Sequence, residues 1–172
     1  VKPGDVVLGL ASSGPHSNGF SLIRKIVEVS GASWDMPFDG ATLADRLMEP
    51  TRIYCKQVAN VMKKVPIHAM AHISGGGLVE NVPRVLPEGT QVVIHRDSWK
   101  RPAIFDWLQK EGNVAEDEML RVFNNGIGLV VIVPAEAADA AVSAFESEGE
   151  KVYRLGEVVN RANAADPGCV VI

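Results

Sequence analysis

Hydrophobic positions along the chain form short continuous runs that alternate with stretches in which apolar residues recur every three or four positions. The continuous runs are rich in valine and isoleucine, which is typical of strands buried in a sheet. They predict strands at residues 5–11, 67–73, 90–95, 127–133 and 151–159. Residues 127–133 (IGLVVIV) form the most apolar run, which predicts a central position in the sheet.

The recurring apolar positions predict helices between these strands. We expect helices at residues 20–29, 43–48, 51–64, 115–122 and 134–148, and one that begins at Ser98 or Arg101 and ends before Gly112. Residues 78–86 also have a helical pattern, but Pro83 lies inside it. Either a helix begins with Asn81 as its N-cap and Pro83 in its first turn, or a turn after the glycines at 75–77 bends at Pro83.

This order of elements predicts a fold of the α/β (α+β) class, with one layer of helices on a sheet. A length of 172 residues fits one domain, which we place at residues 1–160. Residues 161–172 are expected to form a linker and an edge strand at 169–172. Because the chain starts without methionine and enters a strand at once, we expect a piece of a longer protein that lacks part of the functional site.

Composition narrows the classes of function. A net charge of −4 gives no reason to expect nucleic acid or a membrane surface as a partner. No apolar run has the length of a transmembrane helix or the pattern of a signal peptide. Cys55 and Cys169 lie far apart and lack metal-ligand spacing, so we expect reduced thiols, a cytoplasmic location and no metal site in this chain.

A loop with three consecutive glycines follows the strand predicted at residues 67–73. Its polar and glycine positions, after His72, are Ser74, Gly75, Gly76, Gly77, Glu80 and Asn81. Glycine costs backbone entropy and has no side chain to pack, so three in succession need a physical reason. Backbone N–H groups can form a nest for an anion such as phosphate, or the backbone can make a close crossing or tight turn. The residues alone favour neither, and they match neither the Walker nor the dinucleotide-binding motif.

A second polar loop, residues 12–19 (SSGPHSNG), follows the first predicted strand. Its short side chains suit hydrogen bonds to a sugar or phosphate, and its candidate binding residues are Ser13, Gly14, His16, Ser17, Asn18 and Gly19. The simpler interpretation is a turn in which Ser17 or Asn18 caps the helix beginning at Phe20, and the residues alone favour this cap. Our hypothesis is that both loops meet at one ligand.

Other polar residues have more than one interpretation. His16 and His72 could exchange protons near neutral pH, although a lone histidine is more often structural. Glu80 can cap backbone N–H groups or hold a ligand hydroxyl. Arg52 is a planar donor suited to carboxylate or phosphate. No group of residues identifies a catalytic residue or completes a metal site.

Four stretches together resemble the C-terminal domain of aminoimidazole ribonucleotide synthetases, also called phosphoribosylformylglycinamidine cyclo-ligases. They are residues 12–22 (SSGPHSNGFSL), 50–54 (PTRIY), 71–87 (AHISGGGLVENVPRVLP) and 118–128 (EMLRVFNNGIG). The resemblance covers residues 1 to about 159. It implies a mixed sheet of about four strands with helices mainly on one face.

The resemblance implies a part in de novo purine biosynthesis. In this family ATP activates the formyl oxygen of formylglycinamidine ribonucleotide by phosphorylation. An amine nitrogen attacks that carbon, phosphate leaves, and the ring of aminoimidazole ribonucleotide closes. ATP, with magnesium and potassium as assisting ions, binds mainly to the N-terminal domain, which also forms the homodimer. By this resemblance the chain lacks the N-terminal ATP-binding domain. The implied partners are therefore that domain and the ribonucleotide, and this chain is expected to be inactive alone.

By position, the resemblance implies that residues 74–77 and 14–19 hold the ribonucleotide phosphate. We extend the substrate-binding role to Ser13, His72, Glu80 and Asn81. Thiamine monophosphate kinase and selenophosphate synthetase share this type of domain, so another ATP-using activity is one alternative. A non-catalytic binding module is the other. Cys169 is followed by three more residues, so it does not match the terminal cysteine of the related hydrogenase-maturation family.

Overall fold

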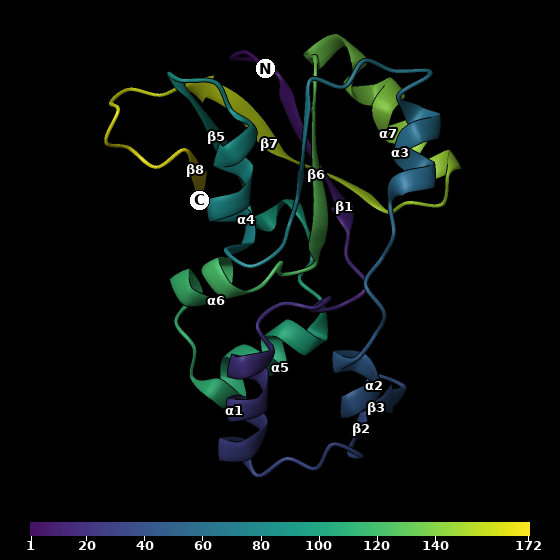
Figure 1. Ribbon diagram of the computed structural model, residues 1–172, viewed down its shortest axis with the longest axis vertical. Coiled ribbons are helices and arrows are strands. Elements are labelled where there is room, and N and C mark those ends of the chain that lie inside the picture. The colour runs from purple at the N-terminus through teal and green to yellow at the C-terminus, as the bar shows by residue number, and fades with distance from the viewer.

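A six-stranded sheet forms the centre of the computed structural model, which describes all 172 residues (Figure 1). The strand order is β4-β6-β1-β7-β5-β8, and only β5 and β8 pair in parallel. The strands are β1 (Val6–Ala11), β4 (Ala69–His72), β5 (Thr90–Ile94), β6 (Ile127–Val133), β7 (Val152–Asn160) and β8 (Cys169–Val171). A separate hairpin consists of β2 (Pro37–Phe38) and β3 (Ala41–Thr42).

Seven α-helices and three short 3₁₀ helices connect the strands. The α-helices are α1 (Phe20–Ser30), α2 (Leu43–Leu47), α3 (Cys55–Val61), α4 (Gly77–Asn81), α5 (Ala103–Gly112), α6 (Glu116–Val122) and α7 (Ala138–Ser147). The 3₁₀ helices are η1 (Val82–Val85), η2 (Arg96–Ser98) and η3 (Ala135–Ala137). The mixed α/β class expected from the order of elements is confirmed.

The expected count of four strands is wrong, because the main sheet has six. All five apolar runs identified in the sequence join this one sheet, and residues 169–171 add β8 beside β5. β6 is an interior strand between β4 and β1, although β1 and β7 occupy the middle of the sheet.

The expectation that helices lie mainly on one face is also wrong. Helix α4 and η1 pack on one face through Leu78 and Val82, whereas α3 and α7 pack on the other through Val61 and Phe145. The reason is the sequence of β6, in which all seven residues are buried. A strand that is apolar at consecutive positions needs cover on both faces.

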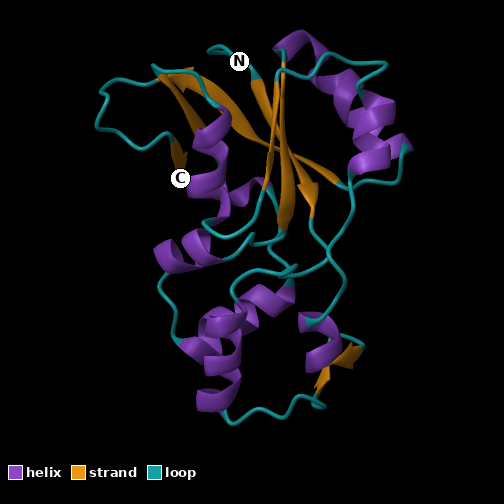
Figure 2. Cartoon of the chain, in the orientation of Figure 1, coloured by secondary structure: helices purple, strands orange, loops and turns teal.

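A third hydrophobic core lies beyond the end of the sheet at which β1 finishes and β6 starts (Figure 2). Helices α1, α2, α5 and α6 form it, and Phe105 and Phe123 are among its fully buried side chains. The loop at residues 12–19 connects the sheet to this helical group, so it lies at their junction.

Local structure departs from expectation in three places. Helix α3 begins at Cys55 and not at residue 51, because Tyr54 is held by a bond from its hydroxyl to the Ala11 carbonyl, 2.7 Å. Helix α4 begins at Gly77 with Gly76 as its N-cap and passes at Val82 into η1, which has Asn81 as its N-cap and Pro83 in its first turn, so each alternative is correct in part. The β2–β3 hairpin lies in a segment for which we predicted no strand.

Candidate functional site

The two polar loops lie side by side. Gly19, and neither Ser17 nor Asn18, is the N-cap of α1, and no side chain caps this helix. Gly19 has a left-handed φ of 78°, and a Cβ there would lie 2.3 Å from the Phe123 ring, so glycine is required. The Asn18 side chain, free of a capping role, places Oδ1 3.9 Å from where a Cβ on Gly75 would lie.

Asn81 holds the triple-glycine turn together from inside. Its Nδ2 donates to the carbonyls of Ser74, Gly75 and Gly77 at 3.3, 3.1 and 2.8 Å, and its Oδ1 accepts from the Ser74 hydroxyl at 3.3 Å. The residue is only 4% exposed. The N–H groups of Gly75 and Gly76 have no acceptor in the protein, so both remain available to a ligand.

A different structural feature surrounds each of the three glycines. At Gly77 the backbone passes close to the backbone of α6, because a Cβ there would lie 1.9 Å from the Leu120 carbonyl oxygen. Gly76 has a left-handed φ of 99°, and the Glu80 carboxylate folds back to within 2.6 Å of its Cβ position. Gly75 is exposed, and nothing but Asn18 lies near its Cβ position. The crossing and the free N–H groups therefore occur in one turn, at different residues.

His16 is buried at the base of the first loop, with 3% of its surface exposed. Its Nε2 accepts from the Ser13 N–H at 3.1 Å, which places the proton of the neutral ring on Nδ1, an atom with no partner. Burial, with a smaller contribution from the nearby charge of His72, lowers the pKa of His16 to about 4. His16 is therefore neutral at pH 7, while His72 is exposed at the end of β4.

The depressed pKa of His16 predicts a loss of stability in mild acid. Because its pKa is about 6.5 in the unfolded chain and about 4 in the folded one, the unfolded state binds more protons between these values. The free energy of unfolding should fall by about 2 kcal/mol between pH 7 and pH 5 from this residue alone. Urea unfolding across this range measures the slope. Asparagine tolerates the left-handed φ of 57° at this position, so His16→Asn should reduce the pH dependence of the free energy of unfolding. An unchanged pH dependence would contradict its assignment to His16.

Asn124 fixes the first loop to the start of β6, a role that we did not predict from the sequence. Its Oδ1 accepts from the Ser12 hydroxyl at 3.0 Å and the Gly126 N–H at 2.8 Å, and its Nδ2 donates to the Gly14 carbonyl at 2.9 Å. The sequence offered one signal, the Asn124–Asn125 pair before an apolar strand, but a turn is the ordinary meaning of that pattern.

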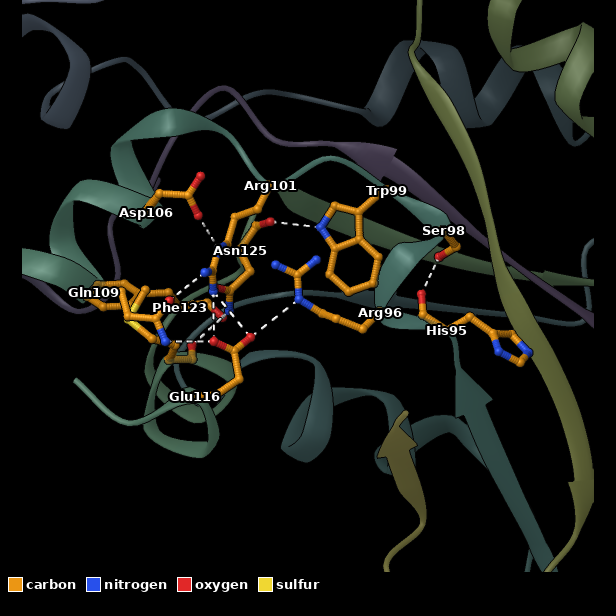
Figure 3. Close-up of polar contacts among 11 residues, drawn as sticks. His95, Arg96, Ser98, Trp99, Arg101, Asp106, Gln109, Glu116, Phe123 and Asn125 are labelled. Carbon is orange, nitrogen blue, oxygen red and sulfur yellow. Dashed lines mark hydrogen bonds and ion pairs between the residues drawn. The ribbon is translucent and has the colours of Figure 1, made fainter. Parts of the chain in front are cut away.

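The neighbouring Asn125 is anchored by the loop before α5. The Trp99 indole N–H donates to the Asn125 carbonyl at 2.9 Å (Figure 3). Beside it, Glu116 accepts from Arg96 at 3.3 Å and from Arg101 at 3.2 and 3.1 Å. This network joins the start of α6 to η2 and supports the turn from which Asn124 projects.

The segment at residues 50–54 closes the first loop from another side. The Ser13 hydroxyl donates to the Pro50 carbonyl at 2.6 Å, and the hydroxyls of Ser17 and Thr51 lie 3.3 Å apart. Arg52 donates to a carboxylate, as its type suggests, but the partner is the buried Glu150 of this chain at 2.9 Å. Arg52 therefore positions this segment in the present structure.

A groove of about 510 Å³ opens beside this segment and reaches His72. Most of its lining is apolar, and it consists of Arg52, Ile53, Tyr54, Cys55, Val58, Met70, His72 and Leu129. No three His, Cys, Asp or Glu side chains are arranged to hold a metal ion. None of the helices combines the length and hydrophobicity needed to cross a membrane.

Comparison with known families places this geometry in context. Residues 2–165 match the model of the family described as AIR synthase related protein, C-terminal domain. Over 171 residues the chain is 53% identical to a phosphoribosylformylglycinamidine cyclo-ligase of Cupriavidus pinatubonensis, covering 99% of this chain and 49% of that protein. It is also 53% identical over 158 residues to the enzyme of that name from Nitrosospira multiformis, covering 92% and 45%. The chain thus spans about half the length of the curated relatives it matches.

Solved structures share the fold at low sequence identity. Thiamine-monophosphate kinase from Stenotrophomonas maltophilia aligns with a TM-score of 0.67 and 16% identity, covering 99% of this chain and 50% of that one. The hydrogenase maturation protein HypE, solved in complex with ATP, aligns with a TM-score of 0.66 and 22% identity, covering 99% and 48%.

Proposed function

The chain belongs to the AIR synthase related proteins as their C-terminal domain, and we propose that it forms the ribonucleotide-binding half of a phosphoribosylformylglycinamidine cyclo-ligase in purine biosynthesis. The observation that carries this proposal is the meeting of the two loops at Asn18 and Gly75, beside unpartnered N–H groups. The proposed reaction is the one named for relatives that are 52–54% identical to this chain.

The substrate phosphate is proposed to lie between the loops. The N–H groups of Gly75 and Gly76 would donate to its oxygens, together with the free Asn18 amide. The α4 helix has only five residues, so its dipole adds little and the N–H groups supply most of the binding. The Glu80 carboxylate, which lies against the Cβ position of Gly76, would accept a hydrogen bond from a ribose hydroxyl.

The remaining loop residues orient the substrate. Ser13, Gly14, Ser17 and Gly19 shape the first loop through their bonds to residues 50–51 and 124 and the close approach of Phe123. His16 and His72 border the site. Because His16 is buried and neutral at pH 7, it supports the first loop without adding a charge beside the substrate.

ATP is proposed to bind mainly to the N-terminal half of the full-length protein. HypE, which shares this fold, was solved with ATP, and the relatives are about twice as long as this chain. When bound there, ATP would activate the formyl oxygen for ring closure. Magnesium and potassium would bind beside ATP in that half, since this chain has no cluster of three metal-ligating side chains. A cytoplasmic homodimer, formed through the same half, completes the proposal.

An assay of the full-length protein for conversion of formylglycinamidine ribonucleotide to aminoimidazole ribonucleotide tests the activity. Turnover is expected from the full-length protein and not from the 172-residue chain alone. Turnover by the chain would overturn the proposed division of labour. Phosphoryl transfer to another substrate without ring closure would support the kinase alternative.

Gly76→Val in the full-length protein should weaken ribonucleotide binding at least about tenfold, because its side chain would crowd the two free N–H groups and displace Glu80. Isothermal titration gives the dissociation constant. Gly149→Val is the matched control, since Gly149 also has a left-handed φ, 84°, but has open space around its Cβ position. Equal dissociation constants for the two variants would count against the phosphate role of this turn.

A further inference from the structure

Strand β4 (Ala69–His72) leaves one edge of the sheet open. It pairs with β6, and no other strand pairs with it. The Ile73 N–H donates to the Gly128 carbonyl at 3.0 Å, and hydrogen-bonded and non-bonded pairs alternate along an antiparallel ladder. The N–H and C=O groups of Met70 and His72 therefore point away from β6, towards the open edge.

The groove of about 510 Å³ lies directly alongside this edge. Met70 and His72 line it from β4, Leu129 from β6, and Tyr54 and Val58 from the start of α3 and from α3 itself. An extended segment added to β4 would form main-chain hydrogen bonds with the open groups and insert alternate side chains into the groove.

The edge is short, at four residues, but its sequence carries no permanently charged or proline residue that would block pairing. Residues 69–72 (AMAH) include no lysine, glutamate or proline, and Ile53 on the groove is 75% exposed. An edge without lysine, glutamate or proline beside an exposed apolar groove is prone to self-association unless another segment covers it.

The relatives of this chain have a second half of comparable length, and the open edge ends at His72, on the border of the proposed site. We propose that an extended strand from the N-terminal half of the full-length protein pairs with β4 and places apolar side chains in this groove. The inference rests on the two-domain organisation within the proposed function and not on the chemistry of ring closure. Docking of the halves would then fix the position of His72 beside the substrate loops.

Amide hydrogen exchange in the full-length protein tests the pairing. The Met70 and His72 amides should exchange at least about 100-fold more slowly than unprotected amides, because they would be bonded to the added strand. Ala71 is the internal reference, since its N–H already points to β6. Unprotected Met70 and His72 amides beside a protected Ala71 would overturn the proposal.

A matched pair of substitutions tests the groove. Ile53→Asp should raise the exchange rates of Met70 and His72 at least about tenfold, because a carboxylate there disfavours apolar docking. Val29→Asp, at a 60% exposed position on α1, should leave these rates unchanged. Unchanged rates in Ile53→Asp overturn the proposed docking, as does protection that disappears on dilution, which would assign the edge to a second copy. Protected amides in a protein that fails the ring-closure assay would reject only the proposed chemistry.

Discussion

Gly77→Ala is expected to destabilise the protein by about 3–5 kcal/mol, which is the largest effect of any single methyl group at the candidate site. The added Cβ would lie 1.9 Å from the Leu120 carbonyl oxygen and 2.9 Å from that of Phe123. Both are backbone atoms, so no side-chain rotation relieves the contact. The left-handed φ of 57° adds strain for any residue with a Cβ. Urea unfolding of the variant and the parent protein measures the difference.

Gly89→Ala separates the two causes. Gly89 also has a left-handed φ, 76°, but nothing lies within 4 Å of its Cβ position. Its substitution should therefore show the conformational cost alone, about 1 kcal/mol. Equal losses for Gly77→Ala and Gly89→Ala would mean that α4 and α6 separate easily and that the close crossing is not essential.

The second large effect is expected for Asn81→Asp, which preserves the shape of the side chain but removes its NH₂ donors. Three carbonyls lose their partner, and a carboxylate oxygen would face them in a buried position. We expect a loss of about 2–4 kcal/mol at pH 7 and weaker ribonucleotide binding by the full-length protein. Denaturant unfolding and titration with the ribonucleotide measure the two effects.

The pH dependence of the stability loss in Asn81→Asp distinguishes lost hydrogen bonds from altered packing. Burial should raise the pKa of the new carboxyl above its unfolded value, so its protonated form, which can donate, is favoured in the folded protein. The loss relative to the parent should therefore be greater at pH 7 than at pH 4. Asn113→Asp, at an exposed residue without side-chain hydrogen bonds, should cost less than about 1 kcal/mol at either pH. A pH-independent loss in Asn81→Asp would point to packing as the cause.

The strands were predictable because their signal is local. Runs such as residues 127–133 are apolar at every position, and their short length and β-branched content favour a strand covered on both faces. The number of strands in the sheet, and the helices that cover each of its faces, depend on which apolar runs pair with one another. That choice depends on contacts between segments far apart in the chain, and the expectation of four strands and one helical face failed there.

The candidate site was predictable in location but not in the roles of its residues. The density of glycine and short polar side chains marked both loops, and the structure brings them together. Ser17 or Asn18 was expected to cap α1, yet Gly19 takes that position, where Phe123 packs against it from a distant segment. Asn124 was missed for the same reason, since its partners Ser12 and Gly14 lie more than 100 residues earlier. Binding of the substrate by these residues stays a prediction.

The pairing of β1 affects how this part of the protein folds during synthesis on the ribosome. Val6 lies opposite Val133 on one side and Glu157 on the other, so the first strand has no sheet neighbour until most of the chain has been synthesised. The loop that follows it also waits for Asn124. Contacts this distant in sequence slow folding, and an unpaired apolar strand such as residues 6–11 is a target for chaperones while it waits. The two polar loops should thus be among the last parts of the nascent chain to reach their final structure.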